Sequence, residues 1–177
     1  MLNKPDEILS TVAEEVFEDL AFVLVMPDDG SVEHDDCPDA ATSVTSISFR
    51  GPFSGTLFLT VSEELLPMIA ANMLGLEDCE TATQEEEQDA FKELLNVVCG
   101  NLLPRIAGVK AVFDVGGATL FDDDRTPRTL PGQSLAGEAR FNLEAGWTEL
   151  ALFIDEETRD GVEFLGVSPE QCAATEE

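Results

Sequence analysis

The chain has 177 residues, of which 44% are hydrophobic, and this supply of apolar side chains can bury the core of one domain. Its 9 Lys and Arg against 37 Asp and Glu give a formal net charge of −28, which opposes binding to nucleic acid or to an anionic membrane. No apolar run approaches the roughly 20 residues that span a bilayer, and the chain opens without the apolar stretch of a signal peptide, so we expect a cytoplasmic protein.

An amphipathic helix is predicted near the start of the chain, over residues 6–22. Its apolar positions recur at the helical spacing of three and four residues, so one side of the helix should face a core. These positions are Ile8, Leu9, Val12, Val16 and Leu20. Residues 27–42, rich in Pro, Asp and Gly, are predicted to form a polar loop.

A β-hairpin and a second helix are predicted next. Polar and apolar residues alternate on both sides of a turn within residues 44–61, and the Gly and Pro residues of 51–55 supply that turn. The second helix is predicted to begin at Ser62 and to end near Gly75, because glycine is common just past a helix terminus. Pro67 fits this helix least well, since proline disrupts the interior of a helix.

A longer helix is predicted from Gln84 to Ile106. It opens on a capping box, in which the Thr83 hydroxyl and the Glu86 carboxylate each satisfy a backbone N–H group that the first turn leaves free. Acidic residues fill the first turn, where the helix dipole favours negative charge. Pro104 is expected to kink or end the helix, because proline lacks an N–H group and its ring clashes with the preceding turn.

The last part of the chain is predicted to be mostly strand. Residues 111–121 form a strand that a glycine pair interrupts, and an exposed loop over residues 121–131 follows. A second hairpin spans residues 136–154, with its turn at 144–146. The acidic tail, residues 156–177, is expected to be partly docked and partly frayed.

The order of helix, two strands, two helices and three strands predicts an α+β fold. In such a fold an antiparallel sheet carries helices packed on one face. We expect one domain over residues 1–155, followed by the tail over residues 156–177.

One side of the long helix carries polar residues that call for an explanation. At about 100° per residue, Asp89, Glu93, Asn96 and Gly100 fall within roughly 60° of one another. An asparagine in mid-helix is a poor helix former, so a carboxamide in line with two acids invites an explanation, and a functional face is one hypothesis. The alternative is an ordinary solvated helix face. The opposite side is apolar and consists of Phe91, Leu94, Leu95, Val98 and Leu102.

The cysteines indicate neither a metal site nor a disulfide framework. Cys37, Cys79, Cys99 and Cys172 are scattered, with no C-x-x-C motif and no paired histidine, so the four spaced ligands that zinc needs are absent. A metal site at His34-Asp-Asp-Cys37 is disfavoured because the segment lies in the polar loop. A nucleophilic Cys99 is disfavoured because no cationic group is apparent that would lower its pKa. We expect no cofactor bound by this chain.

One motif occurs once in the chain, and a second segment matches all but its last position. The motif is an acid or Ser, then three residues, Glu, two residues and Asn. Asp89, Glu93 and Asn96 carry it in the long helix, while Ser10-x-x-x-Glu14-x-x-Phe17 in the first helix has Phe in place of Asn. Phe cannot hydrogen-bond, so at most one copy is chemically equipped. Within this order of elements, the motif resembles the CheC/CheX/FliY family of response-regulator phosphatases, most closely its CheX-like branch, over most of residues 5–155.

Members of this family hydrolyse the aspartyl phosphate of the chemotaxis receiver protein CheY. The resemblance implies that Glu93 and Asn96 carry a phosphatase activity toward phospho-Asp of a CheY-like receiver, with Asp89 as the supporting acid. It also implies that Mg²⁺ belongs to the receiver rather than to this chain, and that the chain forms a homodimer. Three further segments are similar in placement, namely Val12-Ala-Glu-Glu-Val-Phe17, the helix from Ser62 to Gly75 and the hairpin from Gly137 to Trp147.

The resemblance has one departure. The family pattern often continues with a Pro a little over twenty residues after the Asn, and this chain has Asp114-Val-Gly-Gly-Ala-Thr119 in that neighbourhood. The missing Pro keeps an alternative open, which is a non-catalytic module of the same fold that docks on a receiver or on a flagellar-switch protein. Mutation of Asn96 separates the two, since an enzyme loses hydrolysis without losing binding.

Overall fold

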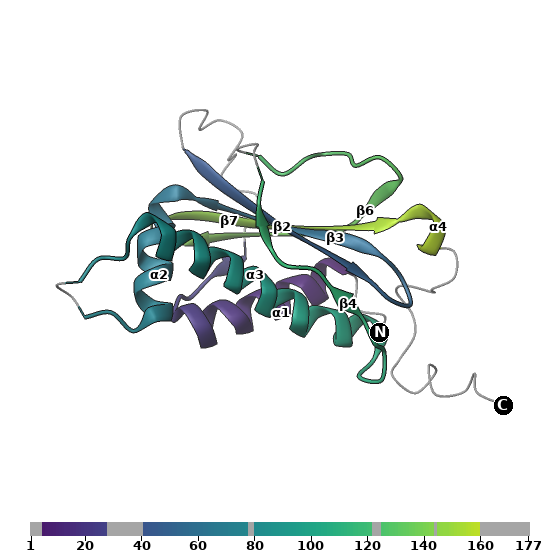
Figure 1. The fold of residues 1–177 in the computed structure, drawn as a ribbon, viewed down its shortest axis with the longest axis horizontal. Coiled ribbons are helices and arrows are strands. Elements are labelled where there is room, and N and C mark those ends of the chain that lie inside the picture. The colour runs from purple at the N-terminus through teal and green to yellow at the C-terminus, as the bar shows by residue number, and fades with distance from the viewer. Residues whose placement is uncertain (1–4, 28–40, 78–79, 122–124, 144, 160–177) are drawn as a thin grey trace.

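Helices cover one face of an antiparallel sheet (Figure 1). The computed structural model describes residues 5–27, 41–77, 80–121, 125–143 and 145–159. Its elements are, in chain order, α1 (Pro5–Ala21), β1 (Met26–Pro27), β2 (Thr42–Arg50), β3 (Gly55–Ser62), the 3₁₀ turn η2 (Glu63–Leu65), α2 (Leu66–Leu74), α3 (Gln84–Ala107), β4 (Asp114–Val115), β5 (Thr119–Leu120), β6 (Gln133–Leu143), β7 (Gly146–Asp155) and α4 (Glu156–Arg159).

The sheet is built from two hairpins that join in its middle. β2 pairs with β3 and β6 pairs with β7, in both cases as antiparallel neighbours. β3 then pairs with β7, so that Gly55 faces Ile154 and Val61 faces Thr148. The described strands run in the order β1-β6-β7-β3-β2-β4, with β5 also paired to β2. The predicted α+β class, with helices packed on an antiparallel sheet, is confirmed.

The first half of the chain follows the predicted elements except at one strand. α1 and the β2–β3 hairpin lie where the apolar patterns place them. The loop predicted over residues 27–42 is wrong at both ends, because Met26–Pro27 forms β1 beside β6 and Thr42 already belongs to β2. Residues 28–40 lie outside the described residues. A strand of two residues is too short to show an alternating pattern, so only its pairing partner reveals it.

Pro67 lies at the start of the second helix, where proline is tolerated. The chain leaves β3 at Ser62, makes the single turn η2 and enters α2 at Leu66, four residues later than predicted. Pro67 therefore occupies the first turn of α2, where its missing N–H group would have no helical partner in any case. The helix ends as predicted before Gly75, whose φ of 66° is a left-handed conformation that glycine adopts without strain.

α3 begins on the predicted capping box and runs past its proline. The backbone N–H of Glu86 donates to Thr83 Oγ1 at 3.3 Å, and the backbone N–H of Thr83 donates to Glu86 Oε2 at 2.7 Å. The helix does not end at Pro104 but continues to Ala107. The carbonyl that loses its helical partner at Pro104 belongs to Gly100, which is exposed, so solvent can replace the missing N–H group.

The second half of the chain follows the prediction in outline. The strand predicted over residues 111–121 consists of two short strands, β4 and β5, which flank the glycine pair and both pair with β2. The hairpin predicted over residues 136–154 is confirmed as β6 and β7. The tail begins with α4, where Thr158 Oγ1 accepts the backbone N–H of Ser54 at 3.2 Å. Residues 160–177 lie outside the described residues.

The main core lies between the helices and the sheet. Side chains from α1, α2 and α3 interlock with alternate residues of β2, β3 and β7, and together they form one apolar cluster. Its fully buried members include Leu9, Val12, Phe17, Ile47, Phe49, Leu57, Leu59, Ile69, Phe91, Leu94, Leu95, Leu150 and Leu152. None of the helices in the described ranges is long and apolar enough to cross a membrane.

The opposite face of the sheet carries a second, smaller apolar cluster. Phe121 and Leu130 pack against it, and Thr126 and Thr60 share a hydrogen bond through their hydroxyl groups. The described ends of residues 121–131, which were predicted as an exposed loop, therefore cover part of this face. The buried members of the cluster are Val44, Phe58, Ala151 and Phe153.

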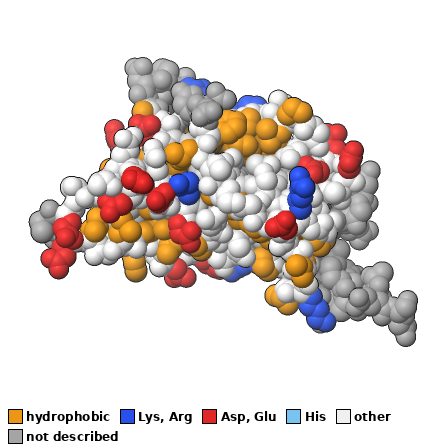
Figure 2. Space-filling model, viewed as in Figure 1, with side chains coloured by type: hydrophobic (Ala, Val, Ile, Leu, Met, Phe, Trp, Pro, Cys, Tyr) orange, Lys and Arg blue, Asp and Glu red, His pale blue; other side chains and the backbone are white. Residues whose placement is uncertain are grey.

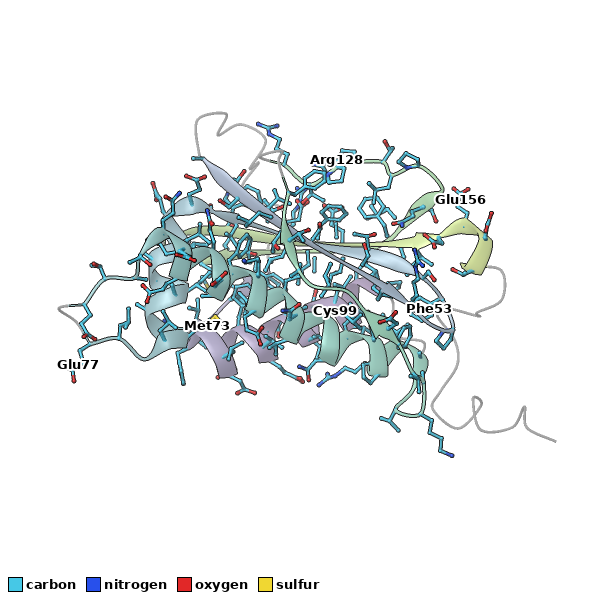
Figure 3. The ribbon with its side chains drawn as sticks, in the orientation of Figure 1. Phe53, Met73, Glu77, Cys99, Arg128 and Glu156 are labelled. Carbon is cyan, nitrogen blue, oxygen red and sulfur yellow. The ribbon has the colours of Figure 1, made fainter. Side chains whose placement is uncertain are left out.

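Charged side chains extend this outer face toward β6. Arg140 and Glu149 face each other across β6 and β7, and Arg140 Nε lies 2.6 Å from Glu149 Oε2. Burial raises the pKa of the Glu149 carboxyl, although the charge of Arg140 opposes the rise. Arg128, which lies on the side of the sheet away from the helices (Figure 3), pairs with Glu138 at 3.6 Å. The ion pairs of this face are thus remote from the polar side of α3.

Candidate active face of helix α3

α3 turns one side to the core and leaves the predicted polar side open. Asp89, Glu93 and Gly100 are exposed, and Asn96 is half-buried. Figure 2 shows Asp and Glu side chains spread over one face of the molecule with few Lys or Arg among them. The five residues predicted for the core side are all buried, namely Phe91, Leu94, Leu95, Val98 and Leu102. Their burial fixes the direction in which the polar side points.

The structure brings Glu93 and Asn96 into direct contact. Asn96 Nδ2 donates a hydrogen bond to Glu93 Oε2 over 3.1 Å. A carboxylate only accepts hydrogen bonds, so the carboxamide must turn its NH₂ group toward Glu93. Asn96 Oδ1 has no partner among the described residues, and it is free to accept a hydrogen bond from outside the chain. The pair therefore holds a neutral acceptor in a defined orientation on the polar side of α3.

Asp89 lies one turn earlier and is engaged with a different residue. Its Oδ1 lies 2.6 Å from Lys92 Nζ, in an ion pair between residues three apart on the helix. The two side chains are 65% and 33% exposed, so solvent screens the pair and its contribution to stability is small. Asp89 shares the face with Glu93 and Asn96 but makes no described contact with them. Lys92 was not among the residues predicted for this face, although an acid and a lysine three residues apart on a helix are a usable signal.

The residues that flank this face do not offer rival chemistry. Cys99 is buried in the helical layer (Figure 3), and desolvation raises the pKa of its thiol to about 12. A thiolate nucleophile at neutral pH is therefore excluded at this position, as expected from the sequence. Asn101, the other carboxamide of the helix, donates its Nδ2 to the backbone oxygen of Val97 at 2.9 Å, so its NH₂ group is already engaged.

The first helix does not repeat the site. Phe17, which stands where Asn96 stands in the repeated spacing, is fully buried in the core. Glu15, two residues before Phe17, forms an ion pair with Arg105 of α3 and so links the two helices. The copy of the motif in α1 therefore serves packing, and only the copy in α3 presents a carboxamide.

The segment that lacks the expected Pro is held to the sheet by strand pairing. Thr119 of β5 faces Ser46 of β2, and the backbone N–H of Gly116 donates to the Ser48 oxygen at 2.9 Å. α3 in turn contacts both β2 and β5. Hydrogen bonds to β2 thus constrain the backbone of this segment beside α3. A proline would have constrained it differently, by fixing its own φ angle.

The structure also bears on metal ligands. Within the described ranges, no three His, Cys, Asp or Glu side chains lie together in a way that would hold a metal ion. The disfavoured candidate His34-Asp-Asp-Cys37 falls outside those ranges.

The fold defines the class of protein. An antiparallel sheet with helices packed on one face makes this a CheC/CheX-like α+β fold. The family model described as Chemotaxis phosphatase CheX matches residues 43–117, which include β2, β3 and all of α3. The resemblance to the CheC/CheX/FliY family is therefore confirmed. A comparison with curated proteins finds no match.

Solved structures share this fold at low sequence identity. The chemotaxis protein CheX from Vibrio vulnificus is 20% identical with a TM-score of 0.64, over 86% of this chain and 99% of that one. CheX from Desulfovibrio desulfuricans is 15% identical with a TM-score of 0.66, over 85% and 99%. CheX in the CheX-CheY-BeF3-Mg+2 complex from Borrelia burgdorferi is 19% identical with a TM-score of 0.61, over 85% and 97%.

We predict that Cys99 resists alkylation in the folded protein. Its thiol is buried and its pKa is raised to about 12, so at pH 8 it holds almost no thiolate and gives iodoacetamide no access. Peptide mass mapping after timed labelling measures the extent of modification, and urea-unfolded protein is the control. Labelling of Cys99 at the same rate in native and unfolded protein would contradict its burial.

Proposed function

We propose that this protein is a phosphatase that hydrolyses the aspartyl phosphate of a CheY-like receiver in chemotaxis or two-component signalling. In this proposal Asn96 is the central catalytic residue and Glu93 aligns the receiver. Asp89 is the supporting acid of the motif. The observation that carries the proposal is the hydrogen bond from Asn96 Nδ2 to Glu93, which engages the NH₂ group and leaves Asn96 Oδ1 as the acceptor available to a ligand. The match of residues 43–117 to the CheX family supports it at the level of the family.

The chemistry explains why a carboxamide suits this position. An aspartyl phosphate is an activated acyl phosphate, and its hydrolysis needs a water molecule held in line with the phosphorus. Positioning of that kind supplies much of the barrier reduction in phosphoryl transfer. Asn96 Oδ1 can accept a hydrogen bond from the water, and a neutral amide adds no negative charge beside the phosphoryl group. A carboxylate at the same position would repel the phosphoryl oxygens.

Glu93 is proposed to act in docking as well as in orienting Asn96. On the resemblance to the family, the receiver carries a Lys and Mg²⁺ on the phosphoryl oxygens, so no metal of this chain is needed. The Glu93 carboxylate is exposed and one of its oxygens accepts from Asn96, which leaves the other to pair with the receiver Lys. Such a pair would align the phosphoryl group with the water on Asn96.

We predict that Asn96→Ala abolishes the acceleration of receiver dephosphorylation and leaves binding intact. Loss of the oriented acceptor should slow hydrolysis about a hundredfold, which corresponds to roughly 2.7 kcal/mol of barrier. The measurement is the decay of a phosphorylated receiver with Mg²⁺, alone and with each protein. Asn101→Ala is the matched control, because it removes an exposed carboxamide from the same helix at a position that points elsewhere.

The same assay decides between an enzyme and a non-catalytic module. Unchanged receiver decay in the presence of wild-type protein, together with detectable binding, would replace the phosphatase by a CheX-like module that docks on a receiver or a flagellar-switch protein. Slow decay caused equally by Asn96→Ala and Asn101→Ala would show that the helix surface matters only for folding or docking.

We predict that added salt tightens the complex with the receiver. The net charge of this chain is −28, and a receiver active site is itself rich in Asp, so the two proteins repel each other electrostatically. Added salt screens this repulsion. The dissociation constant for a beryllofluoride-activated receiver should fall when ionic strength rises from about 0.05 M to 0.3 M. An affinity that instead weakens steeply with salt would mean that specific ion pairs outweigh the general repulsion.

We also propose that the chain acts in the cytoplasm as a homodimer. The segment that runs from the end of α1 into β1 exposes three apolar side chains in alternation, with Phe22 at 74%, Leu24 at 76% and Met26 at 64% exposure. Phe22 also adopts a φ of 52°, a conformation that is unusual for a bulky residue. A second copy that covers this surface would remove these side chains from water.

We predict a dimer mass by light scattering during size-exclusion chromatography. Leu24→Glu should shift the protein to a monomer, because it places a charge within the proposed interface. Val109→Glu is the control, since Val109 is an apolar residue that is 89% exposed and lies just beyond the end of α3. A monomeric wild type, or equal loss of the dimer in both variants, would argue against this interface.

A further inference from the structure

Gly100 lies on the proposed active face, and nothing inside the protein requires a glycine there. It is exposed and follows Asn96 by one helical turn. Apart from its chain neighbours and the adjoining backbone of α3, a Cβ atom added at this position would meet no atom within 4 Å. Glycine weakens the interior of a helix relative to alanine, so its presence in α3 lowers stability, and no packing contact compensates for the loss.

Other glycines of the chain have structural reasons that Gly100 lacks. A Cβ atom at Gly55 would lie 2.2 Å from the backbone oxygen of Phe153, so only glycine lets β3 and β7 approach there. Gly75 adopts a φ of 66° at the end of α2. Neither close approach nor left-handed backbone applies to Gly100, and the ring of Pro104 one turn later is also more than 4 Å from the added Cβ.

The direction of helical side chains connects Gly100 to Asn96. A side chain on an α-helix leans toward the N-terminus and covers the turn before its own Cα atom. Any side chain at position 100 would therefore lean over the turn that carries Asn96, whose Oδ1 must be reached from outside. The neighbouring Asn101 side chain is held against its own helix by its bond to the Val97 oxygen, so it also leaves this area open.

We propose that Gly100 gives the receiver access to Asn96. Because this residue has no side chain, the phosphorylated loop of the receiver can lie directly against α3 beside Asn96. This inference rests on the proposed phosphatase function and adds a specificity-determining residue to it. A larger side chain at position 100 obstructs the approach of the receiver loop to Asn96. Alanine therefore hinders this approach in part, and leucine blocks it.

The test compares Gly100→Ala and Gly100→Leu with Asn101→Ala and Asn101→Leu, which place the same side chains one residue along the same helix. The readouts are the KM and kcat for a phosphorylated CheY-like receiver, binding of the same receiver activated with beryllofluoride, and the melting temperature. Gly100→Leu should raise KM and weaken binding at least tenfold, with Gly100→Ala intermediate. Both Asn101 variants should stay within about twofold of wild type.

The melting temperature separates access from folding. Replacing an exposed helical glycine by alanine should raise it by about 2–4 °C for a domain of this size. A loss of receiver binding in a variant that is more stable than wild type cannot come from unfolding. A lower melting temperature for Gly100→Ala would instead show that α3 needs glycine for its own structure, and it would overturn the inference.

The outcomes distinguish this inference from the proposed function. If wild-type protein accelerates dephosphorylation and Gly100→Leu does so equally well, the access role is wrong and the phosphatase stands. If wild-type protein binds the receiver without accelerating its decay, the phosphatase is wrong, and the binding arm alone decides the role of Gly100. If leucine weakens binding no more at position 100 than at position 101, the access role is wrong in that case also.

Discussion

The rotational setting of α3 is the constraint on which the site depends. The helix buries a stripe of five large apolar side chains, and burial of each is worth about 1.5–3 kcal/mol relative to exposure. A turn of the helix about its axis would expose several of them at once, so the core holds the opposite side at one orientation toward solvent. Glu93 and Asn96 have no other anchor than this, because their only described side-chain bond is the one between them.

Hydrogen-bonding capacity then sets the chemistry within that orientation. An isolated asparagine on a helix surface can present either end of its amide outward. Glu93 removes this freedom, because a carboxylate accepts and cannot donate. Glu93 therefore adds negative charge to the face and also determines which atom of Asn96 is available to a ligand. Lys92 offsets the charge of Asp89 close by, which leaves Glu93 as the acid with a free oxygen.

Local patterns predicted well those features that depend on neighbours in the sequence. The amphipathic helices, the two hairpins and the capping box at Thr83 are all local, and the structure has them. The pairing of β1 and the cover that Phe121 and Leu130 give the outer face depend on residues far away in the chain, and no spacing in the sequence reports such contacts. Pro67 is tolerated because it lies in the first turn of α2, and Pro104 because the carbonyl that it leaves unpaired is exposed. Neither fact can be known before the helix ends are known. For the site, periodicity placed Asn96 on the correct side, but the bond to Glu93 required side-chain coordinates.

The join between the two hairpins has a consequence for how the domain forms. β2–β3 and β6–β7 are each closed by a short turn, whereas the β3–β7 pairing links Gly55 to Ile154 across most of the domain. Contacts between residues so far apart in sequence are slow to form, because the entropy of closing the intervening chain must be lost first. The helix that bears Asn96 lies in sequence between the two hairpins. It packs on β2 and β3 of the first hairpin and on α1, which in turn packs on β6 of the second. The contacts that set the position of α3 are therefore complete only after the two hairpins have joined.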